Sequence, residues 1–204
     1  PVEMATSHEA SVERVKNEGV YAPMFAEAFG DPEISIERIS YALAAFQRSL
    51  RPRVSKFDRV LDGRARLSDT ELEGLHLFRT KAGCANCHNG PLLSDQKYHN
   101  IGLSYYGREL QDLGRFEATK DPADIGKFRT ASLRNIRRTA PYMHNGVMPE
   151  LSGVVTFYNA GGANPRPRED QKDDPHFPKT DPLLAPLNLT PEEREALVAF
   201  LNTL

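Results

Sequence analysis

Cys84-Ala85-Asn86-Cys87-His88 is the most informative stretch of this sequence. A C-x-x-C-H run is the attachment sequence of c-type haem. Its two thiols add to the porphyrin vinyl groups as thioethers, and the imidazole of His88 is then placed to be the proximal ligand of the iron. The sequence therefore predicts one covalently bound haem c on this chain.

Two other uses of a Cys-x-x-Cys pair fit the sequence less well. A structural zinc site would need two more Cys or His ligands at suitable spacing, and the six histidines provide no second pair. A thioredoxin-like dithiol would follow a strand in a βαβ context, which is not visible here. Because the motif uses both cysteines, no structural disulfide is expected.

The composition describes an ordinary soluble protein of one large or two small domains, with 204 residues and a net charge of −2. This charge gives no reason to expect nucleic acid or an anionic membrane as a partner. No apolar run reaches the length of a membrane span, and the N-terminus lacks the apolar segment of a signal peptide. Covalent haem attachment implies assembly outside the cytoplasm. We therefore expect a periplasmic protein whose targeting segment has been removed or left out.

Helices are predicted on both sides of the haem motif. Apolar residues at three- and four-residue spacing over 36–50 predict a helix with a core-facing side, opened by Asp31-Pro32 and closed by Arg51-Pro52. Residues 5–30 are expected to form one or two short helices, broken near Gly19 and Pro23.

Two capping boxes predict further helix starts, at Ser68 with Glu71 and at Thr190 with Glu193. A helical stretch over 151–158 ends before Gly161-Gly162. The segments 89–127 and 163–188 are predicted to be irregular, the first ordered by wrapping a haem and the second a proline-rich surface excursion. Since strand signals are nearly absent, the predicted fold class is all-α, a cytochrome c-like haem domain with long irregular loops.

Several motifs give the sequence a family resemblance. They are Cys87-His88-Asn89-Gly90-Pro91 with Ser94-Asp95, then Gly126-Lys127-Phe128-Arg129-Thr130-Ala131-Ser132-Leu133-Arg134-Asn135, and then Thr139-Ala140-Pro141-Tyr142-Met143-His144-Asn145-Gly146. In this order they resemble the second-haem domain of the bacterial di-haem cytochrome c peroxidase and MauG family. The resemblance implies an N-terminal domain, missing here, that carries another haem. Residues 1–55 would be a helical segment linking from that domain, and 56–204 the cytochrome c-like haem domain.

The resemblance also implies roles for particular residues. Glu3 matches a glutamate that lies over the peroxide-binding haem as an acid–base group for O–O cleavage. Tyr158 stands fourteen residues after His144, where MauG-like members have a tyrosine as the second axial ligand. The alternative is that Tyr158 only packs beside the haem and that Met143 or Met148 supplies a sulfur ligand.

Other positions have weaker assignments. The family likeness implies a calcium ion held by the backbone carbonyls of Thr139 and Pro141, with an asparagine ligand in the missing domain. Arg134 is expected to pair with a haem propionate or to be a surface arginine, and His144 is expected to order the haem pocket. His76 is expected to be a packing or surface residue of a helix, and His8, His99 and His176 are expected to be solvated loop histidines.

The predicted function is the C-terminal part of a MauG-like di-haem peroxidase that uses hydrogen peroxide. The haem on this chain would store or relay oxidising equivalents, with a redox protein donor or an oxidisable protein substrate as partner. A plain peroxidase would instead need methionine ligation at this haem. The alternative from another class is a mono-haem electron-transfer cytochrome without peroxidase activity.

Overall fold

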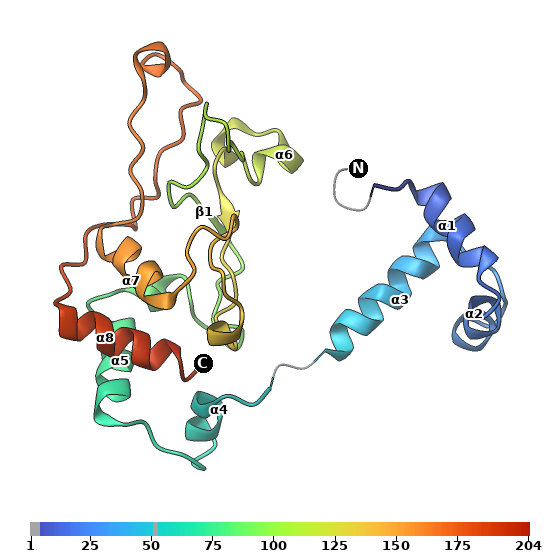
Figure 1. Cartoon of the computed structure of the whole chain (residues 1–204), viewed down its shortest axis with the longest axis horizontal. Helices are drawn as coiled ribbons and strands as arrows, with labels where there is room; N and C mark the ends of the chain where they lie inside the picture. The colour runs from blue at the N-terminus through green and yellow to red at the C-terminus, as the bar shows by residue number, and fades with distance from the viewer. Residues whose placement is uncertain (1–4, 51–52) are drawn as a thin grey trace. The chain divides into compact units, whose positions relative to one another are not determined.

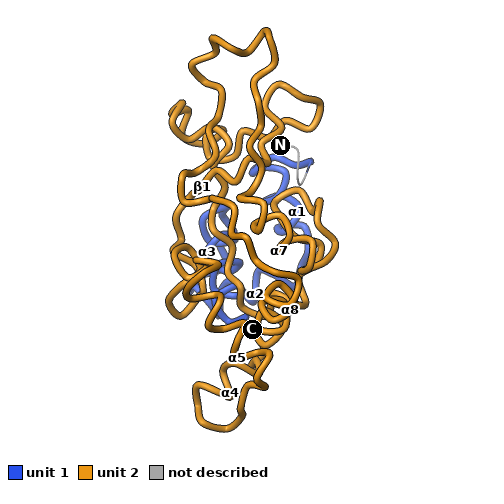
Figure 2. Tube along the Cα trace, turned by 90° about the vertical axis from the view of Figure 1, so that its left-hand side faces the viewer, with its two compact units in different colours: residues 1–52 blue, residues 53–204 orange. Residues whose placement is uncertain are grey.

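A computed structural model describes residues 5–50 and 53–204. The chain divides into two compact units, residues 1–52 and residues 53–204 (Figure 2). The boundary that the sequence predicts, between residues 55 and 56, stays a prediction, as does the linking role of the first segment. Glu3 lies outside the described residues.

Unit 1 consists of three helices, α1 (His8–Asn17), α2 (Tyr21–Phe29) and α3 (Ile36–Ser49). Ser7 caps the start of α1 by accepting a hydrogen bond from Ala10 N at 3.2 Å. The break near Gly19 occurs as predicted, but Pro23 does not break a helix. It lies in the first turn of α2, where its missing N–H has no partner to lose.

The core-facing side predicted for α3 is wrong within unit 1. None of its residues is buried, and Leu43 and Phe46 are 58% and 60% exposed. Three short helices enclose too little volume to cover the apolar side of a 14-residue helix. The helix also begins later than expected, because Ser35 caps its start by accepting a hydrogen bond from Arg38 N at 3.3 Å, while Asp31 pairs with the Arg38 side chain at 2.6 Å. Its predicted stop at Arg51-Pro52 lies outside the described residues.

The core of unit 2 is built around the crossing of α5 (Asp69–Arg79) and α8 (Pro191–Leu201), with α7 (Leu151–Asn159) packed against α8 (Figure 1). The crossing is close at Gly74, where a Cβ atom would lie 2.0 Å from the Ala196 carbonyl oxygen. The ring of Phe200, which is 1% exposed, meets the ring of Phe78 at 5.3 Å. The ring of Phe57, from α4 (Lys56–Leu61), also lies 5.3 Å from the ring of Phe200.

Both predicted capping boxes are present. Ser68 N donates to Glu71 Oε2 at 2.7 Å, and Glu71 N donates back to Ser68 Oγ at 3.3 Å. At the start of α8, Thr190 and Glu193 make the same pair of bonds at 2.8 and 3.2 Å. Each cap stabilises its helix by about 1 kcal/mol.

The rest of unit 2 is mostly irregular, as the sequence predicts. The strands β1 (Tyr98–His99) and β2 (Phe128–Arg129) form a two-stranded antiparallel pair, with His99 opposite Phe128. With so little strand, the all-α fold class is confirmed. Within the described ranges, no helix is both long and apolar enough to cross a membrane. The remaining short elements are α6 (Phe116–Thr119) and the 3₁₀ turns η1 (Cys84–Asn86), η2 (Pro122–Asp124), η3 (Ile136–Arg138) and η4 (Glu169–Gln171).

Candidate haem site

The haem motif lies just after α5, in the turn η1. The hydrogen bonds from Cys87 N and His88 N to Cys84 O, at 3.3 and 2.8 Å, place the two thiols one turn apart. Both thiols are free. Burial raises the pKa of Cys84 to about 11, and it also raises the pKa of Cys87. A redox dithiol needs a thiolate near neutral pH, so these protonated thiols do not favour that alternative.

His88 is oriented by one hydrogen bond. Its Nδ1 lies 3.2 Å from the carbonyl oxygen of Leu93. Because a carbonyl only accepts, Nδ1 is the protonated nitrogen and Nε2 keeps its lone pair. Burial lowers the pKa of His88 and so favours this neutral form. A ring fixed in this way is prepared to bind a metal through Nε2.

Tyr158 is held on α7 close to the two thiols. Burial raises its pKa to about 12, and Cys84 and Cys87 add to the rise through their proximity. No hydrogen bond from another described residue contributes to this shift. The structure therefore places a half-buried phenol, without a polar partner among the described residues, within range of the charges of the motif's two cysteines. Met143 and Met148 lie in a turn closed by the hydrogen bond from Tyr142 N to Met148 O at 2.7 Å.

An apolar cavity of about 380 Å³ opens beside His88. Its walls are mainly aromatic and aliphatic side chains of α4, α5 and α8. His88 lines this cavity, whereas Cys84, Cys87 and Tyr158 are not among its lining residues. By their chemistry, two thiols, an imidazole and a phenol near an apolar cavity are groups that fit haem c. The apolar wall residues include Phe57, Leu61, Leu75, Phe78, Ala85, Leu93 and Phe200.

Two of the motifs that the sequence places far apart lie side by side. Ser94 Oγ donates to Thr130 O at 2.7 Å, and Thr130 N donates to Lys97 O at 2.8 Å. Ser132 Oγ donates to Leu92 O at 2.6 Å. These bonds tie the chain after His88 to the segment after β2, which explains why serines stand in both motifs.

Arg134 joins the same region to α4. Its Nε donates to the Pro91 carbonyl at 2.8 Å, and its guanidinium forms an ion pair with Asp58. Burial works to raise the pKa of Asp58, but the hydrogen bonds from Ser55 and Arg134 outweigh it and lower the pKa. Arg134 thus has protein partners, and its pairing with a haem propionate stays a prediction.

His144 lies flat against Phe128 of β2, with 3.6 Å between the ring centroids and 12° between the planes. Its side chain is 17% exposed, and burial lowers its pKa. The neutral ring is therefore well ordered, while its role in a haem pocket stays a prediction. Thr139 and Pro141 are exposed, and among the described contacts no hydrogen bond ends on either carbonyl oxygen, so both are free to bind a cation.

The expectation that His99 is a solvated loop histidine is wrong. Its side chain is 19% exposed, and its Nδ1 lies 2.7 Å from Asp181 Oδ2 while its Nε2 lies 2.9 Å from Asp95 Oδ2. Burial works to lower the pKa of His99, but the bonds to Asp181 and Asp95 outweigh it and raise the pKa. This cluster is not predictable from local spacing, because Asp181 is 82 residues away from His99 along the chain.

Cys87 adds a possible metal ligand to this cluster. The ligand atoms of Cys87, Asp95 and His99 all lie within 4.8 Å of one another. Both nitrogens of His99 are already bound to carboxylates, however, and Cys87 is one of the two attachment thiols. The arrangement therefore does not favour a zinc site over haem.

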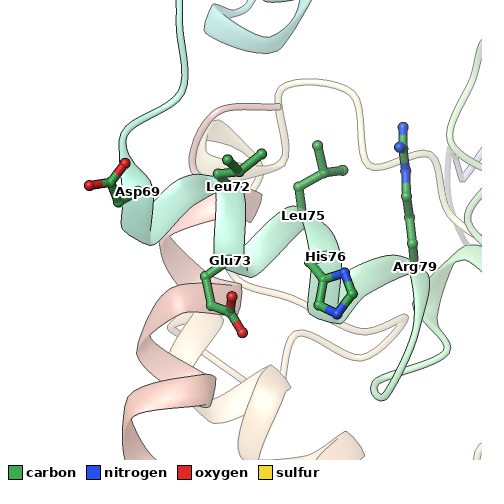
Figure 3. Close-up of a pocket in the computed structure, with 6 residues that line it drawn as sticks. All are labelled: Asp69, Leu72, Glu73, Leu75, His76 and Arg79. Atoms are coloured by element: carbon green, nitrogen blue, oxygen red, sulfur yellow. The ribbon is translucent and has the colours of Figure 1, made fainter.

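A second depression, of about 390 Å³, lies along α5 (Figure 3). Every residue that lines it comes from this one helix, so it is a surface hollow rather than an enclosed site. The exposed side chain of His76 projects from it, as expected for a surface histidine. The lining residues are Asp69, Leu72, Glu73, Leu75, His76 and Arg79.

Comparison with known proteins identifies the family. The family described as di-haem cytochrome c peroxidase matches residues 1–66. The cytochrome-c peroxidase IdrP1 of Pseudomonas sp. (strain SCT) is 36% identical over 214 residues, which cover 90% of this chain and 53% of that protein. The methylamine utilization protein MauG of Methylorubrum extorquens is 36% identical over 206 residues, which cover 100% of this chain and 54% of that protein. The chain belongs to the di-haem cytochrome c peroxidase and MauG family.

A solved structure extends the likeness to the fold. A MauG-like protein associated with microbial copper homeostasis superposes with a TM-score of 0.80 at 34% identity. The match covers 100% of this chain and 64% of that one. The chain therefore spans about half of the length of the curated family members it matches. Membership of this family implies covalently bound haem c.

Proposed function

We propose that this chain is the C-terminal part of a MauG-like di-haem peroxidase that uses hydrogen peroxide. In this proposal Cys84 and Cys87 would hold one haem c, and His88 and Tyr158 would bind its iron. The bound haem would supply a redox centre that stores or relays oxidising equivalents, and a second haem is expected in a preceding domain. Glu3 supplies the acid–base group there.

The position of Tyr158 carries the proposal. Its phenol is near enough to both thiols for them to raise its pKa, has no polar partner among the described residues, and follows His144 by the spacing of MauG-like members. When bound, the haem supplies an iron centre whose ferric and higher oxidation states a hard phenolate donor would stabilise. Such a ligand lowers the reduction potential and suits the holding of oxidising equivalents.

The surroundings of Tyr158 make its ligation depend on the metal. Since the pKa of the phenol is about 12 in the protein alone, Tyr158 stays protonated near neutral pH. If Tyr158 is to bind iron as a phenolate, it would have to give up that proton to solvent. His88 needs no such change, because its Nδ1–H is already bound to Leu93 and its Nε2 is free of a proton.

A peroxidase reaction also determines which molecules the protein would react with. Hydrogen peroxide is the oxidant, and a redox protein donor or an oxidisable protein substrate is the source of electrons. A calcium ion is held partly by the free carbonyls of Thr139 and Pro141. Haem attachment outside the cytoplasm favours a periplasmic location.

The EPR spectrum of the ferric Tyr158→Phe variant tests this proposal. Phenylalanine keeps the ring and its packing but cannot ligate, so we expect loss of the wild-type low-spin signal and a more positive reduction potential. Tyr142→Phe is the matched control, because the hydroxyl of Tyr142 already has a protein partner and donates to Ile136 O at 3.2 Å. An unchanged low-spin signal in Tyr158→Phe would exclude tyrosine ligation and favour Met143 or Met148.

A further inference from the structure

The cluster of Asp95, His99 and Asp181 lies against the second thiol of the haem motif. His99 Nε2 is 3.9 Å from Cys87 Sγ. Both ring nitrogens face a carboxylate oxygen at hydrogen-bond distance, and a carboxylate can only accept. His99 therefore carries a proton on each nitrogen and is a cation between two anions.

The same histidine joins two distant parts of unit 2. Asp95 follows the haem motif and is tied back to it by the bond from Asp95 N to Cys87 O at 2.7 Å. Asp181 belongs to the proline-rich excursion, residues 163–188. The side-chain link between His99 and Asp181 therefore ties this excursion to the chain beside Cys87.

Backbone contacts fix the base of the excursion at the same point. Asp181 N donates to Asn100 O at 2.8 Å, and Asn100 Nδ2 donates to Lys179 O at 3.0 Å. Ala163 N donates to Ile101 O at 3.1 Å, and Asn100 is only 4% exposed. The carboxylate of Asp181 is thus held in place by more than its bond to His99.

Charge next to the haem-attachment thiol is therefore fixed by the fold. His99 contributes one positive charge, and Asp95 and Asp181 contribute two negative charges, which leaves a net charge of −1. Lys97 and Lys127 bring positive charge near this cluster, since Lys97 lowers the pKa of Cys87 and Lys127 lowers the pKa of Asp181. Lys127 is itself 3.4 Å from Asp124, which offsets its charge.

We propose that His99, held between Asp95 and Asp181, is a positioning residue that sets the reduction potential of the haem bound through Cys87 and anchors the 163–188 excursion beside it. The inference rests on the proposed attachment of haem to Cys84 and Cys87. Fixed charge close to a haem changes the free energy of adding an electron to its iron, and a protein tunes haem potential by such neighbouring groups. The cluster therefore links the reduction potential of the haem to the ordering of the 163–188 excursion.

Two substitutions separate the effect of charge from the effect of loosening the excursion. Asp181→Asn removes one negative charge, so the potential should become more positive. His99→Gln removes the positive charge while keeping an amide that can hydrogen bond, so the potential should become more negative. A unit charge about 10 Å away at an effective dielectric of about 20 changes the equilibrium constant for reduction roughly tenfold. Both variants weaken the same link by removing one of its charges, so loosening alone would shift both potentials in one direction.

The experiment is a spectroscopic redox titration of the haem-loaded protein, with wild type, both variants and Asp174→Asn as the control. Asp174 lies in the same excursion but accepts a hydrogen bond from Tyr106 Oη at 2.7 Å, so its loss should leave the potential unchanged. Limited trypsin digestion supplies a readout that does not involve the haem. We expect faster cleavage after Lys172 or Lys179 in both His99→Gln and Asp181→Asn.

The outcomes distinguish this inference from the function on which it rests. Opposite shifts of potential, with faster trypsin cleavage, support the role of His99. Shifts of the same sign, or none, in variants with full haem content overturn it and leave the proposed function intact. A protein without covalent haem, shown by intact mass and the pyridine haemochrome spectrum, would overturn both.

Discussion

The charges around His99 predict how stability depends on pH. The pKa of His99 is raised in the folded protein, so its contribution to stability is fully present below the unfolded pKa of about 6.5 and is lost as pH rises through the folded pKa. The pKa of Asp95 is lowered to about 2, so its contribution is present above about pH 4 and is lost as pH falls toward 2. The cluster should therefore stabilise the fold most between about pH 4 and 6.5.

Urea unfolding of wild type and His99→Gln at several pH values checks this expectation. The difference in unfolding free energy should be about 1.5–3 kcal/mol near pH 6, as for other hydrogen bonds to charged groups. It should shrink as pH rises past the folded pKa of His99. A difference that stays constant from pH 5 to pH 9 would mean that His99 stabilises the fold by packing and not by its charge.

At the scale of single residues, the sequence predicts groups of residues that stand close together along the chain. Cys84, Cys87 and His88 stand within five positions, so one turn of chain is enough to bring them together. The cluster at His99 could not be predicted in that way, because it needs Asp181 to return from 82 residues away. Arg134 was singled out from a motif, but its partners, Asp58 and the Pro91 carbonyl, come from the fold and were not anticipated.

At the scale of the elements, the crossing of α5 and α8 leaves no room for a larger residue at Gly74. A Cβ atom on Gly74 would meet the Ala196 carbonyl oxygen at 2.0 Å and Phe200 Cβ at 2.7 Å. Gly74→Ala must therefore separate the two helices, and we expect a loss of about 1–3 kcal/mol in unfolding free energy, as for other overpacked cores. Thermal or urea unfolding measures it.

Gly153 of α7 is the matched control for that substitution. A Cβ atom added there meets nothing within 4 Å. Gly153→Ala should therefore raise the unfolding free energy by up to about 1 kcal/mol through helix propensity alone. If the two substitutions changed the unfolding free energy equally, the close helix crossing would not be the reason why position 74 requires glycine.

Helix boundaries were predictable where a side chain caps the backbone locally. Ser68 and Thr190 begin their helices as expected, since each cap involves residues only three positions apart. The burial of a helix side was not predictable, because periodicity shows that α3 has an apolar side but not what covers it. The close approach at Gly74 was missed for the same reason, since it depends on a partner more than 100 residues later.

At the scale of the whole molecule, the number of covalent haems on the native protein tests whether it is a di-haem peroxidase. Family members are described as di-haem proteins, and this chain spans about half of the matched relatives and has two cysteines, both in one motif. We expect the native polypeptide that contains these 204 residues to carry two covalent haems, measured by intact mass together with the pyridine haemochrome spectrum. Two haems would leave one iron free to react with peroxide while His88 and Tyr158 occupy the other. A single six-coordinate haem would leave no such position, and the chain would then act as an electron carrier without peroxidase activity.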